Sequence, residues 1–62
     1  MNALIHTPCG LIYGTAEFDH DLSLVEVTFG TDQEIYNMSF GRMHHYSKGE
    51  KVLFAPENIK VQ

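Results

Sequence analysis

The chain has one cysteine, two prolines, no tryptophan and no long apolar run in its 62 residues. Because Cys9 is alone, the chain cannot form an internal disulfide, and a single thiol is typical of a reducing compartment. The sequence also lacks a basic-then-apolar leader, and it has no stretch approaching the roughly 18 apolar residues of a membrane span. We therefore expect a cytoplasmic protein without a membrane span.

Basic residues are scarce as well, with four Lys and Arg against eight Asp and Glu and a formal net charge of −4. The four bases all lie in the last third of the chain: Arg42, Lys48, Lys51 and Lys60. Nucleic-acid affinity rests largely on neutralising phosphates with Lys and Arg. The charge therefore argues against DNA or RNA binding and favours a protein partner, and a nucleic-acid-binding barrel is kept only as a further alternative.

The chain does have turn-forming residues at regular intervals. They recur roughly every 7 to 11 residues, which is typical of small all-β folds. These positions are Gly10, the run 19–21, Gly30, Gly41, Gly49 and Pro56. The pattern predicts an all-β single domain over residues 1–62, a five- to six-stranded small barrel of SH3-like or OB-like shape.

Alternation of apolar and polar residues predicts strands at 3–6, 11–18, 23–29, 34–40, 51–55 and 59–61. The clearest local prediction is a hairpin over 25–40 that reverses at 30–33, with 41–47 as a loop or single turn. Its expected inward set is Val25, Val27, Phe29, Tyr36, Met38 and Phe40. Gly14 inside the second strand predicts a bulge or a close approach of another backbone segment.

The predicted loop carries the candidate binding surface, which consists of Arg42, Met43, His44, His45 and Tyr46. Met and aromatic residues are enriched at protein interfaces, and histidines make contacts sensitive to pH near neutrality. An open strand edge, at 3–6 or at 59–61, would also invite self-association. The leading interpretation is a non-catalytic module that binds and modulates or escorts a partner protein and forms a homo-oligomer.

Metal binding and catalysis are weaker interpretations. His44, His45, His6 and Cys9 are the candidate metal ligands, because imidazole and thiolate suit zinc, nickel or copper. However, adjacent histidines on an extended chain point to opposite sides, and no Cys-x-x-Cys or His-x3-His spacing occurs. The 19–21 run fits a turn, since Asp side chains bond nearby backbone amides. A barrel of this size offers no deep cleft. We therefore predict no cofactor and no enzymatic activity.

The C-terminal two-thirds of the chain resembles the TOBE domain, a small β-barrel of ABC importers and of Mop-type molybdate-binding proteins. The likeness lies in Gly49-Glu50-Lys51-Val52 and in the close from Pro56 to Val61. It implies a TOBE-like barrel that pairs with its copies and holds a molybdate-like oxyanion, or a divalent transition metal, between subunits. Ser39 and Lys48 would contact that ligand. The chain departs from the family in a shorter strand before Pro56 and in the loop after Ser39.

Overall fold

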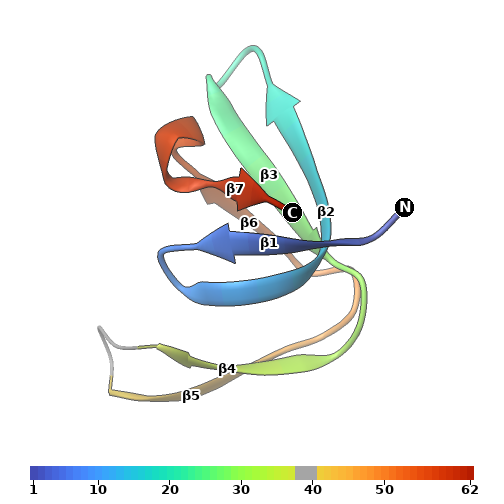
Figure 1. Ribbon diagram of the computed structural model, residues 1–62, viewed down its shortest axis with the longest axis vertical. Helices are drawn as coiled ribbons and strands as arrows, with labels where there is room; N and C mark the ends of the chain where they lie inside the picture. Colours follow the sequence, from blue (N-terminus) through green and yellow to red (C-terminus); the bar gives the residue numbers. More distant parts are fainter. Residues whose placement is uncertain (38–40) are drawn as a thin grey trace.

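The computed structural model describes residues 1–37 and 41–62, and most of them lie in β-strands (Figure 1). Five strands form an antiparallel sheet in the order β6-β3-β2-β1-β7, and β4 and β5 form a second, two-stranded sheet. The bounds are β1 Ala3–Thr7, β2 Gly10–Asp19, β3 Leu24–Phe29, β4 Gln33–Asn37, β5 Arg42–Tyr46, β6 Lys51–Phe54, the 3-10 helix η1 Pro56–Asn58 and β7 Lys60–Val61. The prediction of an all-β chain is confirmed. No helix among the described residues is long and apolar enough to cross a membrane.

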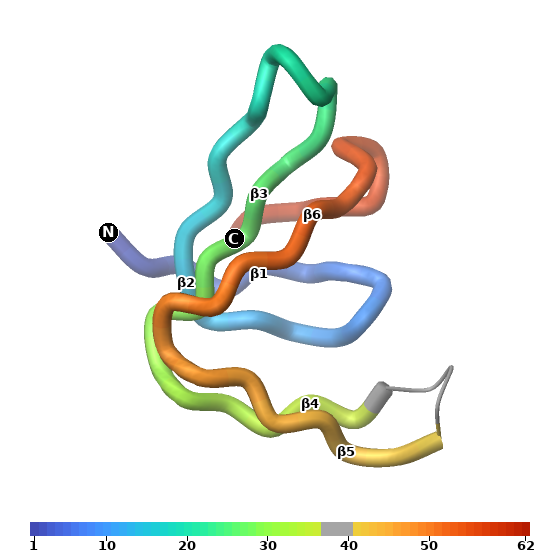
Figure 2. The backbone as a smooth tube through the Cα atoms, turned by 180° about the vertical axis from the view of Figure 1, so that it is seen from behind, coloured from blue at the N-terminus to red at the C-terminus, as the bar shows by residue number. Residues whose placement is uncertain are grey.

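In the described residues neither sheet closes on itself, so the closed barrel of the sequence interpretation is not seen. The strands β6 and β7 end the larger sheet, and within residues 1–37 and 41–62 the strands β4 and β5 pair only with each other. The two-stranded sheet instead folds toward the start of β2, where β4 runs beside it in both views (Figure 2). The result is two sheets that face a shared interior from different sides.

The long strand β2 changes partners at Gly14. Its first half pairs with β1, and its second half pairs with β3, so that Gly14 lies opposite both Ala3 and Phe29. A Cβ atom at this position would collide with the backbone carbonyl oxygen of Thr28. The predicted close backbone approach is confirmed, and it explains why a residue without a side chain occupies this position.

The predicted hairpin over 25–40 is wrong, because β3 does not pair with β4. Val25 lies opposite Phe54, and Gln33 lies opposite Tyr46. Val25 and Gln33 are eight positions apart in the sequence, and so are their partners Tyr46 and Phe54. Equal spacing on both sides means that the register is continuous. The segments β3–β4 and β5–β6 are therefore the two arms of one long antiparallel hairpin that is bent in the middle.

The bend occurs at residues 30–33, where the sequence predicted a reversal. Phe29 N–H donates to the Glu50 carbonyl (2.9 Å), and Gly49 N–H donates to the Phe29 carbonyl (2.8 Å). The Lys48 N–H donates to Asp32 Oδ1 (2.7 Å). These bonds join the two arms across the bend. Gly and Asp therefore form a corner within the hairpin here. The same residue types are equally suited to a tight turn, which is why the sequence predicted a reversal.

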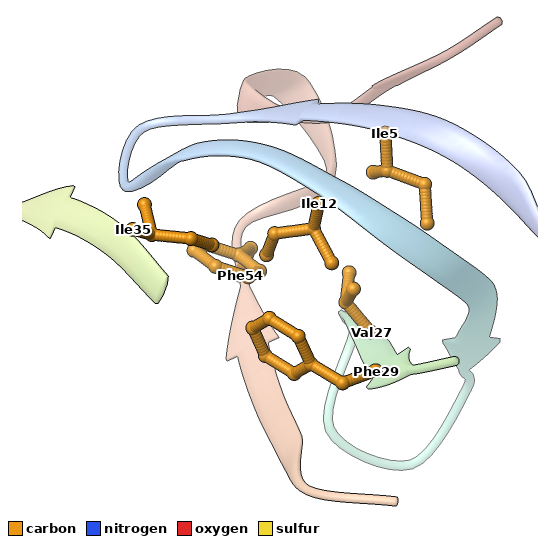
Figure 3. Packing of buried hydrophobic residues seen from close by; sticks show 6 residues of the cluster. All are labelled: Ile5, Ile12, Val27, Phe29, Ile35 and Phe54. Carbon is orange, nitrogen blue, oxygen red and sulfur yellow. The ribbon is translucent and has the colours of Figure 1, made fainter. Parts of the chain in front are cut away.

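The core consists of six apolar side chains that converge between the sheets (Figure 3). They are Ile5, Ile12, Val27, Phe29, Ile35 and Phe54. The inward positions predicted for Val27 and Phe29 are confirmed, and Val25 packs half-buried against the same cluster. Tyr36 was expected inside, but Ile35 takes the buried position and Tyr36 is exposed. The other expected core residues of this strand, Met38 and Phe40, lie outside the described residues.

The turns and edges are mostly as expected. The N–H groups of Asp21 and Leu22 donate to Asp19 Oδ1 (2.9 and 3.1 Å), which confirms the turn interpretation of 19–21. Of the two segments proposed as an open edge, 59–61 contributes the edge strand β7. The other, 3–6, lies in β1 between β2 and β7 and is not an edge.

Candidate functional site

The candidate binding residues form strand β5, Arg42–Tyr46, and not the predicted loop. Four of the five are exposed, and Tyr46 is half-buried. At the end of the two-stranded sheet far from the bend, β4 lies between β5 and the five-stranded sheet in both views (Figures 1 and 2), and among the described residues β5 pairs only with β4. We call β4 and β5 together the ribbon. The five candidate residues are thus held in a defined extended conformation along one side of the protein.

The two faces of the ribbon differ because side chains alternate along a strand. His44 lies opposite Ile35, which is buried, so Arg42, His44 and Tyr46 belong to the face directed at the core. Met43 lies opposite Tyr36 on the other face, and these side chains are 53% and 54% exposed. The outward face therefore presents two large apolar side chains side by side.

Aromatic stacking anchors the ribbon to the core. The ring of Tyr46 lies on the ring of buried Phe29, with centroids 4.4 Å apart and an interplanar angle of 10°. The His44 ring is tilted against Tyr46 with a centroid distance of 4.5 Å. A row of three rings thus runs from the interior to the exposed part of β5. This row fixes the position of the strand relative to the five-stranded sheet.

The environment of Tyr46 favours the neutral form of its phenol. Burial raises the pKa of its phenol, and the nearby Cys9 and Glu50 raise this pKa further because their negative charges disfavour a phenolate. Tyr46 therefore remains neutral and apolar in its stacked position over the physiological pH range.

The candidate metal ligands are not brought together. His44 and His45 point to opposite faces of β5, and His45 Nδ1 lies 3.9 Å from Glu34 Oε1. His6 is exposed in β1, whereas Cys9 is half-buried against the core. Across residues 1–37 and 41–62, no group of three His, Cys, Asp or Glu side chains is placed to hold a metal ion.

Of the two ligand residues implied by the TOBE resemblance, the structure describes Lys48. Ser39 lies outside the described residues. Lys48 is exposed at the bend, where its N–H is taken by the carboxylate of Asp32. That carboxylate would repel an oxyanion placed at the same position.

Sequence reasoning missed an acidic hollow at the far end of the β2–β3 hairpin. A concave region of about 320 Å³ is lined by Glu17, Phe18, Asp19, His20, Asp21 and Glu26. Glu17 and Glu26 lie directly opposite each other, and Glu26 also contacts Lys51 at 3.5 Å. Four acids within ten positions were visible in the sequence. Their convergence depends on the pairing of β2 with β3, which alternation alone does not specify.

Comparison of the chain with protein-family models, curated proteins and solved structures yields no significant match.

Proposed function

We propose that this protein is a non-catalytic module that binds a partner protein through the ribbon. The observation that carries the proposal is the exposed pair of Tyr36 and Met43 on the outward face of a ribbon anchored by Tyr46. Met and Tyr are enriched in protein interfaces, where their large side chains fill pockets on the partner. The proposed activity is to modulate or escort that partner.

The free energy expected from burying Tyr36 and Met43 suits residues at the centre of an interface. Fully burying one large apolar side chain contributes about 1.5–3 kcal/mol. Because each member of the pair is roughly half exposed, covering both would contribute about 1.5–3 kcal/mol by the same scale. A stable complex needs more than this, so the partner must also contact neighbouring parts of the ribbon.

The test compares the wild-type protein with the double variant Tyr36→Ser/Met43→Ser. The matched control is Leu22→Ser, because Leu22 is 55% exposed but lies in the turn between β2 and β3. Purified tagged proteins are used to retain partners from extract, and each retained protein is quantified by mass spectrometry. We expect the double variant to lose a defined partner that the wild type and Leu22→Ser retain. Equal retention by all three proteins would refute the assignment of the site.

Self-association is a separable part of the proposal. The strand β6 ends the five-stranded sheet within the described residues, and its Leu53 side chain is exposed. Unpaired strand edges invite pairing with another chain. Light scattering coupled to size exclusion should show a dimer or larger species that Leu53→Lys weakens. A monomer at all concentrations would remove this part and leave partner binding intact.

A further inference from the structure

We infer that the partner adds an extended segment to the free edge of β5, and that this segment alternates acidic and apolar residues. The inference rests on the proposed function and specifies the chemistry of the partner. It follows from three properties of β5: its position, its charge and its alternation of faces.

The position of β5 makes its outer edge available for strand addition. The strand pairs with β4 on one side, and within 1–37 and 41–62 no other strand pairs with it. An unpaired edge presents backbone N–H and C=O groups to an incoming strand. Five residues give an edge of about 17 Å. The stack of His44, Tyr46 and Phe29 holds this edge in place before a partner arrives, which lowers the cost of ordering it.

The charge of β5 selects the occupant. The strand carries Arg42 and two histidines and has no acidic residue, although the whole chain is acidic. A second copy pairing along the same edge would bring no carboxylate of β5 to Arg42, because β5 has no acidic residue. An acidic segment places a carboxylate beside Arg42, and opposite charges on neighbouring strands are stabilising. The edge therefore favours an acidic partner over a second copy of this chain.

The alternation of faces gives the segment its pattern. Residues opposite each other on neighbouring strands share a face of the sheet. Acidic residues of the segment would therefore lie beside Arg42 and His44 on one face. The residue between them would lie beside Met43 on the other face and extend the apolar row that begins at Tyr36. The expected sequence is acidic, apolar, acidic.

The first experiment uses the full chain and a short synthetic peptide that alternates glutamate and valine, with binding measured by NMR titration. The comparison peptide alternates lysine and valine. Arg42→Glu is compared with Lys60→Glu, because both residues are exposed and the charge change is the same. We expect Arg42→Glu to weaken binding of the acidic peptide at least tenfold, and Lys60→Glu to change it less than twofold. Equal effects of the two substitutions would overturn the charge argument.

The second experiment tests strand addition without changing the protein. Two forms of the acidic peptide carry N-methyl groups on alternate backbone amides, in complementary sets. In an added strand one set of amides faces β5 and the other faces away. One form should therefore lose at least tenfold in affinity while the other binds like the parent peptide. Equal affinities of the two forms, whether retained or lost, would overturn strand addition.

These outcomes are separable from those of the proposed function. If Tyr36→Ser/Met43→Ser loses the partner while Arg42→Glu and N-methylation have no effect, the ribbon is the binding site but strand addition is wrong. If the double variant also retains the partner, both proposals fail.

Discussion

The five-stranded sheet and the ribbon contain parts of the same long hairpin, yet they differ in how their residues are used. Five of the six core side chains come from the larger sheet, and the ribbon supplies only Ile35. The register is continuous across the bend, so hydrogen bonding alone does not distinguish the two halves. The two halves differ in the strands that flank them. Among the described residues the β3–β6 half is flanked by β2, whereas β5 is flanked only by β4. The ribbon is therefore the less covered half of the hairpin, and it is the half to which we assign partner binding.

The largest loss of stability is expected from removing the side chain of Phe29, which supports both halves of the hairpin. Phe29 is fully buried, and it also carries the stacked ring of Tyr46. Phe29→Ala should cost about 3–5 kcal/mol, which is enough to unfold much of a small domain with a marginal core. Chemical denaturation followed by circular dichroism measures the loss. Phe18→Ala is the control, because Phe18 is 44% exposed, and it should cost less than about 1 kcal/mol. Similar losses for both variants would mean that the core is not centred on Phe29.

A smaller effect should separate the two halves. Tyr46→Ala removes the stack, and the lost aromatic contact and burial together should cost about 2 kcal/mol. Hydrogen exchange should then show faster opening of the amides of β4 and β5, with β2 and β3 protected as in the wild type. Tyr36→Ala is the control within the ribbon, because its side chain faces outward, and it should leave exchange unchanged. Uniform loss of protection in Tyr46→Ala would show that the ribbon does not open independently.

The smallest expected effect is on alkaline stability. The pKa of Tyr46 is raised in the folded protein, mainly by burial, so the fold favours the neutral phenol. The associated stability is fully present below the unfolded-state pKa of about 10, and it is lost as the pH rises through the folded-state pKa. The temperature of thermal unfolding should therefore fall more steeply in the wild type than in Tyr46→Phe as the pH rises above about 10. Parallel curves for the two proteins would contradict this origin of the pKa shift.

Particular residues show how far alternation could predict this structure. The strands from Gly10 to Asp19 and from Leu24 to Phe29 follow the pattern of apolar and polar residues, and Val27 and Phe29 are buried as expected. Prediction failed at β4 because Ile35 and Tyr36 are both apolar, and alternation cannot say which of two adjacent apolar residues points inward. Four of the five residues in Arg42–Tyr46 are exposed, and that they form a binding site stays a prediction. Their strand conformation was not predicted, because the sequence of a polar strand that pairs on one edge resembles that of a loop.

The sequence by itself determined that this chain is all-β and where most strands lie. These features depend on residues near in sequence, whose side chains alternate and whose turns have local causes. Only the tertiary structure decided that the segment after Phe29 bends and does not reverse, and that the acids of β2 and β3 meet. Those outcomes depend on which distant strands pair, and pairing follows from the burial of Ile35 and Phe54 against the same core.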